Sequence, residues 1–347
     1  MSGRRYPYMG IMKAHDILDV KRKAVELSRR WHDIWKRVSE RLPPPEPSKP
    51  QHEFAPLIGA ICDEQIPAEV AWGFPEWLYN RLGSFELQVL IEVDYKAVLE
   101  QYLNEHQERL KNIDERTRKE YLESVPKKIK NALKYFKKRG KTPVTIFENR
   151  KYPAPEVYFM LRVIPGIGPK KASMITRDFA YRSLGLVKSN AWFDQIKERN
   201  PEFDVTHHHL ITMPIDVHVA KVFSRLFGLK RANWRKLQSD PLLVQDVITF
   251  SKLAFPDLPV KLDDILWNVG REWCHEDNPL CQECLLRDIC DAGQQFLQVR
   301  QRALYNSPFP LTFPMNSNER VKRANKRSFA VIPGLHPHRI TLQTLFT

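Results

Sequence analysis

The stretch that decides the fold is IPGIGPKKA, residues 164–172. It lies between two apolar-patterned segments, EVYFMLRV at 156–163 and SMITRDFAYRSLG at 173–185. Gly166 and Gly168 permit a tight turn, because glycine adopts backbone angles that other residues resist. The pattern predicts two helices joined by a hairpin. Such a turn either serves packing alone or lets a phosphate approach the free N–H groups of the second helix.

Two lysines, Lys170 and Lys171, follow the turn directly. Both can be solvated residues that bind phosphate. A lysine that is partly desolvated beside another cation can instead lose its proton and act as an amine nucleophile that forms a Schiff base. Adjacent helical residues point about 100° apart, so only one of the two is expected to face a pocket.

A carboxylate follows some distance along the chain, in PIDVHV at residues 214–219. Asp216 precedes an apolar helical pattern, which is the position of an N-cap. A capping carboxylate beside a sugar can also stabilise positive charge on that sugar, so the two roles are compatible.

Four of the five cysteines lie close together, with the spacing C-x6-C-x2-C-x5-C: Cys274, Cys281, Cys284 and Cys290. Four consecutive thiolates with a single short pair favour an iron–sulfur cluster. Structural zinc is the alternative, and a disulfide pair is a poor third choice. The fifth, Cys62, lies on an apolar segment and is expected to be buried and inert.

Helical periodicity dominates the chain and strand-like alternation is scarce, so the fold class is predicted to be all-α. The expected organisation is an amphipathic segment 1–41 packing with the cysteine region, a proline-rich linker 42–52, a helical domain with the hairpin 53–184, an insertion 185–213, the Asp216 helix with the cysteine region 214–292, and an irregular basic tail 293–347.

The composition is basic, with 55 Lys and Arg against 41 Asp and Glu and a net charge of +14 over 347 residues. This favours a polyanionic partner, of which nucleic acid is the usual one; a membrane surface or simple solubility are the alternatives. No apolar run is long enough to span a bilayer and the first residues lack a secretory signal pattern. We therefore expect an intracellular protein without a membrane partner.

Other features keep an ordinary interpretation beside a functional one. The lysine-rich stretch 127–141 is either a solvated helix face or a surface that follows DNA phosphates. The basic tail around 320–327 is a weaker candidate for a DNA contact. Residues 207–209 are three histidines, which alternate faces in most backbones and are not expected to hold a metal. The tryptophans expected to lie in the core are Trp31, Trp35, Trp72 and Trp77.

Together these motifs resemble the endonuclease III branch of the helix-hairpin-helix DNA glycosylases. IPGIGPKKA is similar to the hairpin L-P-G-V-G-x-K-x-A of that family, which places its catalytic lysine at Lys170. IDVHVAKVFSR is similar to the motif V-D-x-H-x-x-R/K-V, which places its catalytic aspartate at Asp216. The resemblance covers residues 53–292.

Two further matches support the resemblance. Residues 270–274, GREWC, are similar to the G-R-x-x-C entry into the [4Fe–4S] loop of the family, and the four clustered cysteines would be the ligands. ICDEQIPAEVA is similar to the helix whose glutamine, here Gln65, fills the gap left by an extruded base. The DNA contacts that we expect are Gln65, Gly166, Gly168, Lys171 and Arg271.

The resemblance implies two helical lobes that flank a DNA cleft, one of them a six-helix barrel ending in the hairpin and the other containing the cluster. It also implies a monomer that binds double-stranded DNA with a damaged base or an abasic site. The nucleotide is flipped out, Lys170 attacks the sugar C1′ and expels a base of the oxidised type, and Asp216 supports the sugar cation. β-Elimination from the Schiff base then nicks the strand. In a prokaryote the protein would lie in the cytoplasm and nucleoid.

Two departures from the family pattern bear on the substrate. The loop HEDNPL at 275–280 is acidic where that of the family is basic, and the insertion 185–213 lies next to the expected lesion pocket. An 8-oxoguanine preference stays open. The alternatives are a monofunctional glycosylase for uracil, mismatched thymine or adenine, and a non-catalytic DNA-binding protein.

Overall fold

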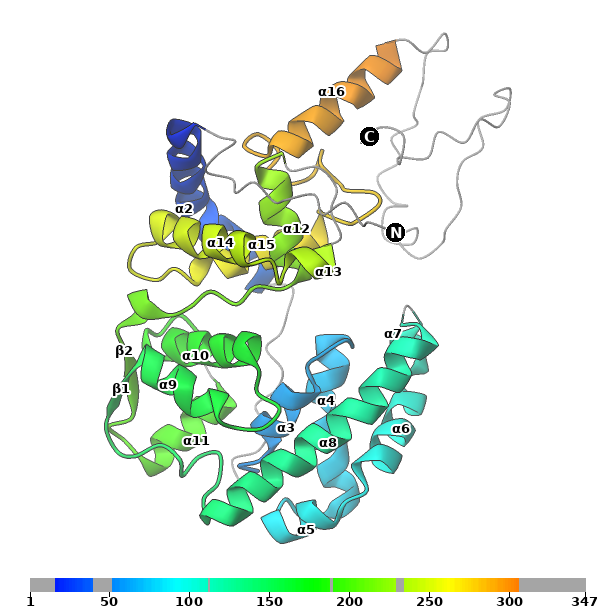
Figure 1. Cartoon of the computed structure of the whole chain (residues 1–347), viewed down its shortest axis with the longest axis vertical. Helices are drawn as coiled ribbons and strands as arrows, with labels where there is room; N and C mark the ends of the chain where they lie inside the picture. Colours follow the sequence, from blue (N-terminus) through cyan, green and yellow to red (C-terminus); the bar gives the residue numbers. More distant parts are fainter. Residues whose placement is uncertain (1–15, 40–51, 112, 188–189, 229–233, 306–347) are drawn as a thin grey trace, which may run out of the picture.

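The computed structural model describes residues 16–39, 52–111, 113–187, 190–228 and 234–305 (Figure 1). Helices dominate the described residues, which confirms the predicted all-α class. The helices are α2 (Ile17–Ser39), α3 (Ala55–Cys62), α4 (Ala68–Leu82), α5 (Leu87–Glu92), α6 (Tyr95–Glu105), α7 (Gln107–Leu110), α8 (Glu115–Arg139), α9 (Ala154–Arg162), α10 (Pro169–Ser183), α11 (Ala191–Arg199), η1 (His208–Leu210), α12 (Val217–Leu226), α13 (Trp234–Leu237), α14 (Pro241–Ala254), α15 (Lys261–Glu272) and α16 (Asp291–Tyr305). Two short strands, β1 (Lys151–Pro153) and β2 (Asp204–Thr206), pair in parallel.

The buried apolar side chains form two separate clusters. The first core is built from α3 to α11 and the two strands, with Leu258 and Val260 from the chain before α15. The second core is built from α2, α12, α14, α15 and the cysteine segment. Figure 1 shows the same grouping, with α3 to α11 in the lower part of the view and α2 and α12 to α16 above. The N-terminal helix α2 therefore packs with elements more than 170 residues away in sequence.

The long helix α8 shows why the lysine-rich stretch is helical. Asp114 caps its N-terminus by accepting a hydrogen bond from the Thr117 N–H at 2.7 Å, and Gly140 ends it with a left-handed φ of 59°. Its apolar residues recur every three to four positions and are buried in the first core, while most of its lysines are exposed. The lysines thus lie on a solvent-exposed face of α8, and both interpretations of the stretch are compatible with that exposure.

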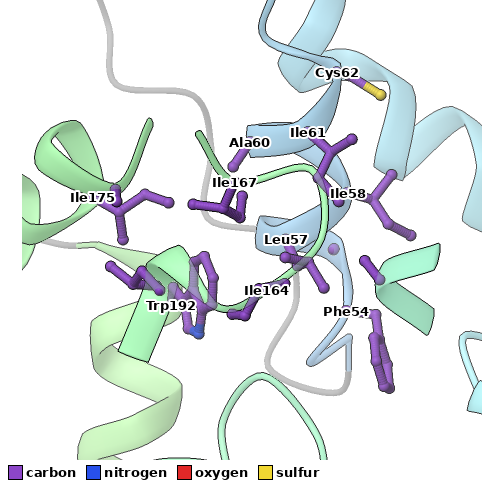
Figure 2. Packing of buried hydrophobic residues seen from close by; sticks show 14 of the residues in the cluster. Phe54, Leu57, Ile58, Ala60, Ile61, Cys62, Ile164, Ile167, Ile175 and Trp192 are labelled. Carbon is purple, nitrogen blue, oxygen red and sulfur yellow. The ribbon is translucent and has the colours of Figure 1, made fainter. Parts of the chain in front are cut away.

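The predicted hairpin joins α9 to α10. Gly166 has a φ of +88°, and a Cβ built on it would lie 3.1 Å from the Lys128 Cβ and 3.3 Å from the Ile61 Cγ1. Glycine is therefore required there for both backbone and space. Figure 2 shows Ile164 and Ile167 of the turn among the apolar side chains of α3. This packing holds the start of α10 against the end of α3.

Residues 185–213 contain α11, β2 and η1 in their described part. Trp192, Phe193 and Ile196 of α11 are buried in the first core, and the Trp192 Nε1 donates to the Pro143 carbonyl at 3.1 Å. β2 pairs with β1, which directly precedes α9. The segment expected to be an insertion is therefore packed into the core that supports the hairpin.

Residues 293–305, expected to begin an irregular tail, belong instead to α16. The pattern QQFLQVRQRALY already carries apolar residues at helical spacing, so the helix is locally encoded. The basic tail around 320–327, the start of the N-terminal segment and nearly all of the proline-rich linker lie outside the described residues. Cys62 is fully buried in the first core, and burial raises the pKa of its thiol to about 12, as the expectation of an inert cysteine requires.

Candidate active site and cysteine centre

Lys170 and Asp216 lie next to each other although 45 residues separate them. The Lys170 Nζ is 3.6 Å from the Asp216 Oδ2. Lys170 belongs to the first turn of α10, and Asp216 is the N-cap of α12. The pair therefore joins a helix of the first core to a helix of the second core. The lysine side chain is 47% exposed and the aspartate side chain 10% exposed, so the amine stays accessible to a ligand.

Asp216 combines two tasks that the sequence left open. Its Oδ1 accepts a hydrogen bond from the Val219 N–H at 2.9 Å, which is an N-cap interaction. Its Oδ2 faces the lysine amine. The two oxygens thus act separately, and the cap holds the carboxylate rigidly at the position where Lys170 meets it.

The neighbouring Lys171 points elsewhere, as the 100° offset of adjacent helical residues requires. Its Nζ donates to the Ile61 carbonyl at 2.6 Å and to the Glu64 Oε2 at 3.1 Å, and its side chain is 12% exposed. Burial lowers the pKa of Lys171, although Glu64 opposes the shift. The Lys171 ammonium thus joins the start of α10 to the end of α3, and its expected contact with DNA stays a prediction.

The remaining expected DNA contacts differ in their surroundings. Gln65 is exposed and has a left-handed φ of 61°, a conformation that is uncommon for a residue other than glycine. Nothing lies within 4 Å of a Cβ built on Gly168, so the outer side of the turn is open. The Arg271 guanidinium stacks 4.6 Å from the Trp267 ring centroid. Among the described residues, no direct contact joins Gln65, Gly168 or Arg271 to Lys170. None of the three is buried.

A second carboxyl group, that of Asp63, is affected by the positive charge of Lys170. It follows α3, and its Oδ2 accepts a hydrogen bond from the Trp72 Nε1 at 3.3 Å. Burial raises the pKa of Asp63, and the positive charge of Lys170 is the largest opposing effect. Sequence reasoning passed over this residue. The available signal was an acid placed directly after a helix, APLIGAIC, that contains no polar side chain except the thiol.

A buried polar network also connects the two cores. Arg177 of α10 forms ion pairs with its neighbour Asp178 and with Asp263 of α15. The Tyr181 hydroxyl donates to the Asp264 Oδ2 at 2.5 Å, and the Trp31 Nε1 donates to the same oxygen at 3.3 Å.

The two aspartates of this network are unusual acids. Burial raises the pKa of Asp263 to about 7 and that of Asp264 to about 6, although Arg177 opposes both shifts. Sequence reasoning missed the network, although the acid pair in KLDDILW stands out within an apolar helix.

The cysteine segment follows α15 and contacts α12. The Arg225 Nη1 donates to the Cys274 Sγ at 3.2 Å, and the Cys290 Sγ donates to the Arg225 carbonyl at 3.3 Å. The backbone N–H groups of Leu286 and Gly293 donate to the Cys284 and Cys290 sulfurs at 3.5 and 3.4 Å. The first and last cysteines of the set therefore meet at a single arginine of α12.

The donor set fits a soft metal centre. Four cysteine sulfurs occur in one segment, and the N–H groups around them are of the kind that stabilises cluster sulfurs. Burial raises the pKa of Cys284 and Cys290 to about 12, so a metal would have to displace their protons on binding. In the described part of the chain, however, no group of three or more His, Cys, Asp or Glu side chains is arranged to hold a single metal ion. The four-iron cluster thus stays a prediction from the sequence.

Comparison with known proteins adds no name to this site: no protein-family model matches the chain, and no curated protein matches it. Within the described ranges, none of the helices combines the length and apolar character that crossing a bilayer requires.

Proposed function

We propose that the chain is a DNA repair glycosylase with abasic-site lyase activity, which removes a damaged, oxidised base from double-stranded DNA as a monomer. The observation that carries the proposal is the apposition of the Lys170 amine and the Asp216 carboxylate at 3.6 Å, each in the first turn or at the cap of a different helix. A protein that only bound DNA would need phosphate contacts, not an amine paired with a carboxylate from a separate core.

The chemistry follows from the two groups. Lys170 must give up its proton before it attacks, and the adjacent Asp216 carboxylate can accept that proton. The amine then attacks C1′ of a flipped nucleotide, the proton held by Asp216 passes to the departing base, and the carboxylate so restored stabilises positive charge on the sugar. The resulting Schiff base permits β-elimination and a nick 3′ to the lesion.

The surroundings of the pair support binding of a DNA strand. The turn is open at Gly168, so a phosphate can approach the N–H groups of α10. The net charge of +14 favours association with a polyanion. In a prokaryotic cell such an enzyme would work at the nucleoid.

The four cysteines would hold a [4Fe–4S] cluster whose role is structural. The segment that carries them contributes few residues to the second core, Leu286 and Ile289 among them, so bound iron would add the cross-links that packing does not supply. The cluster takes no part in the chemical steps proposed for Lys170 and Asp216.

Borohydride trapping on duplex DNA with an abasic site tests the proposal. We expect wild-type protein to form a covalent adduct and Lys170→Ala to form none. Lys170→Arg keeps the positive charge, so this variant should bind the same DNA but form no covalent adduct. That result would distinguish a lysine that acts as the nucleophile from one that only contacts phosphate. Lys252→Ala, a change of an exposed lysine on α14, is the matched control and should trap normally.

Two results would contradict the assignment. An undiminished adduct with Lys170→Ala would remove the nucleophile from Lys170. Base release without any adduct from wild type, with nicking only after alkali, would favour the monofunctional alternative.

A further inference from the structure

A cavity of about 370 Å³ lies between the end of α8 and the end of α9. Its lining comes from the last turns of these two helices and from the chain that connects them. The side chains that line it are Tyr135, Arg139, Lys141, Ile146, Met160 and Val163. Cavities that bind small molecules measure about 300–1,000 Å³. This one therefore has room for a single small ligand.

The inner wall of the cavity is fixed by the first core. Tyr135, Ile146 and Met160 are partly buried and pack against that core. Ile146 follows a turn in which the Thr142 N–H donates to the Thr145 hydroxyl at 2.7 Å and the Thr145 N–H donates to the Thr142 hydroxyl at 3.2 Å. The wall is thus ordered without a ligand, which lowers the entropy that binding costs.

The end of α9 adds an exposed apolar strip. Val163 is 58% exposed and lines the cavity, and Phe159, which is 66% exposed, lies outside the lining. The two residues are four positions apart and so share one face of the helix. Exposed apolar side chains that adjoin a cavity extend the surface on which a ligand can pack.

Two cations lie at the opening of the cavity. The Arg139 guanidinium carbon lies 3.8 Å from the centroid of the Tyr135 ring. The chain turns back at Gly140, and the Lys141 N–H donates to the Phe136 carbonyl at 3.3 Å, so the Lys141 side chain reaches the same cavity. In the described part of the chain, neither cation forms an ion pair, and no acidic side chain lines the cavity. Both charges are therefore available to an anion.

This lining favours a ligand with a flat apolar part and an anionic part. Nucleobases stack on aromatic rings and on arginine side chains, and apolar side chains such as Met160 pack against them. Two unpaired cations at the opening suit a phosphate group. A nucleotide has both parts. The lysine-rich stretch 127–141 ends at this cavity, and its charge attracts polyanions.

We propose that this cavity binds one nucleotide, with its base on the apolar wall and its phosphate at Arg139 and Lys141. Neither Lys170 nor Asp216 lines the cavity, so the inference goes beyond the proposed lyase function and does not depend on it. The nucleotide is either free or an unpaired member of a DNA strand, and the probes below distinguish these two sources.

Calorimetric titration with thymidine 5′-monophosphate tests the charged part of the site. Wild type should bind this ligand, and Arg139→Gln/Lys141→Gln should weaken binding roughly tenfold or more, because both phosphate contacts lose their charge. Lys134→Gln/Lys138→Gln is the matched control. It removes the same charge from exposed positions of α8 outside the lining, and it should bind within about twofold of wild type.

A second pair of variants tests the apolar part without changing charge. Val163→Trp fills the cavity and should weaken binding of the nucleotide by a similar factor. Phe159→Trp, the same enlargement one turn earlier on α9 and outside the lining, should bind as wild type does. Both positions are exposed, so the melting temperatures of the two variants should stay close to that of wild type. Thymidine and inorganic phosphate, titrated separately, should each bind more weakly than the nucleotide.

Single-stranded oligothymidylate distinguishes the two sources. Binding of the mononucleotide that Val163→Trp weakens supports a free nucleotide. Binding of the oligonucleotide alone, again weakened by Val163→Trp, supports a nucleotide within a strand.

Other outcomes overturn the proposal. Equal binding by wild type and Val163→Trp, or no binding of either probe, removes the site. Inorganic phosphate that binds as tightly as the nucleotide shows that the base contributes nothing. A peptide of glutamate and phenylalanine that alone binds in a Val163-dependent way would make the cavity a protein-docking surface. Loss of mononucleotide binding in Lys170→Ala would place the nucleotide at the reactive pair. Failed borohydride trapping with intact binding at the cavity would overturn the lyase function alone.

Discussion

The two cores of the molecule are stabilised by different means. The first core is apolar and rich in aromatic rings; Phe179, for example, makes edge-on contacts with Trp192 and Phe147. All the buried aspartates and lysines among the described residues lie instead in α2, in α15, or at the cap and within α12 of the second core. Both cores thus exclude water from apolar side chains, and the second also contains buried charges that are paired.

Lys23 illustrates how the second core works. Its side chain is fully buried, and its Nζ donates to the Leu226 carbonyl at 2.9 Å and to the Asp291 Oδ2 at 2.7 Å. One residue thereby ties α2 to the end of α12 and to the start of α16, next to the last cysteine. Because the candidate reactive pair takes its lysine from one core and its aspartate from the other, perturbing either core should disturb it. The predictions below separate the two contributions.

The largest effect is expected at the bridge between the cores. Arg177→Met removes the cation that pairs with Asp263 and leaves a buried carboxylate without its partner. We expect a loss of about 3–5 kcal/mol in the free energy of unfolding, measured by chemical denaturation.

Arg182→Met, five residues further along the same helix, is the matched control. Its ion pair with Asp194 is about one-third exposed, and its loss should cost at most about 1 kcal/mol. Equal losses in the two variants would show that the charges of the second core contribute no more than surface pairs do.

The next effect concerns the cysteines, of which four lie beside the second core and one lies in the first. Cys284→Ser should remove most of the iron and the visible absorbance, and lower Tm, because it takes away one cluster ligand. Cys62→Ala should leave the iron content unchanged, since its buried thiol lies in the other core. A colourless wild-type protein that contains one zinc would overturn the cluster assignment.

A smaller and sharper contrast lies within the hairpin of the first core. Gly166→Ala should destabilise the protein by about 1–3 kcal/mol, because a side chain at φ +88° is strained and would press on Lys128. Gly168→Ala should change stability by about 0.5 kcal/mol or less, since its Cβ meets open space.

Gly168→Ala should nevertheless weaken binding of abasic DNA in a titration, because the methyl group obstructs the approach of a phosphate. Normal DNA affinity in Gly168→Ala would count against a phosphate at this turn.

The smallest effect is a pH dependence of stability that arises in the second core. The pKa of Asp263 is raised from an ordinary 3.8 to about 7, and that of Asp264 to about 6. Between the ordinary pKa and the raised pKa of each group, the folded protein therefore binds more protons than the unfolded chain. Stability contributed by these groups is therefore present at the acid end and declines as pH rises from about 4 to about 7. The free energy of unfolding, measured by chemical denaturation at several pH values in this range, should depend less steeply on pH in Asp263→Asn. An unchanged slope in that variant would show that Asp263 is ionised throughout.

The local parts of the structure could be predicted from the sequence. Periodicity indicated the all-α class, the glycines at 166 and 168 indicated the turn, and Asp216 was recognisable as an N-cap because its partner is an N–H three residues away. These features depend on neighbours within a few residues, where backbone geometry and capping determine the outcome. Prediction from local patterns failed at residues 293–305. Their apolar spacing is helical, yet they were expected to belong to an irregular tail, and they form part of α16.

Tertiary structure decided how these local parts meet. No local rule shows that Lys171 faces Ile61 and Glu64 while Lys170 faces Asp216, because the offset between adjacent residues says only that they diverge. Likewise the pairing of Arg177 with Asp263 depends on how α10 packs on α15, 86 residues later. Sequence determined which groups the chain could offer to a site. Packing of the two cores determined which of them are buried, and burial sets their charge because water no longer screens or solvates them.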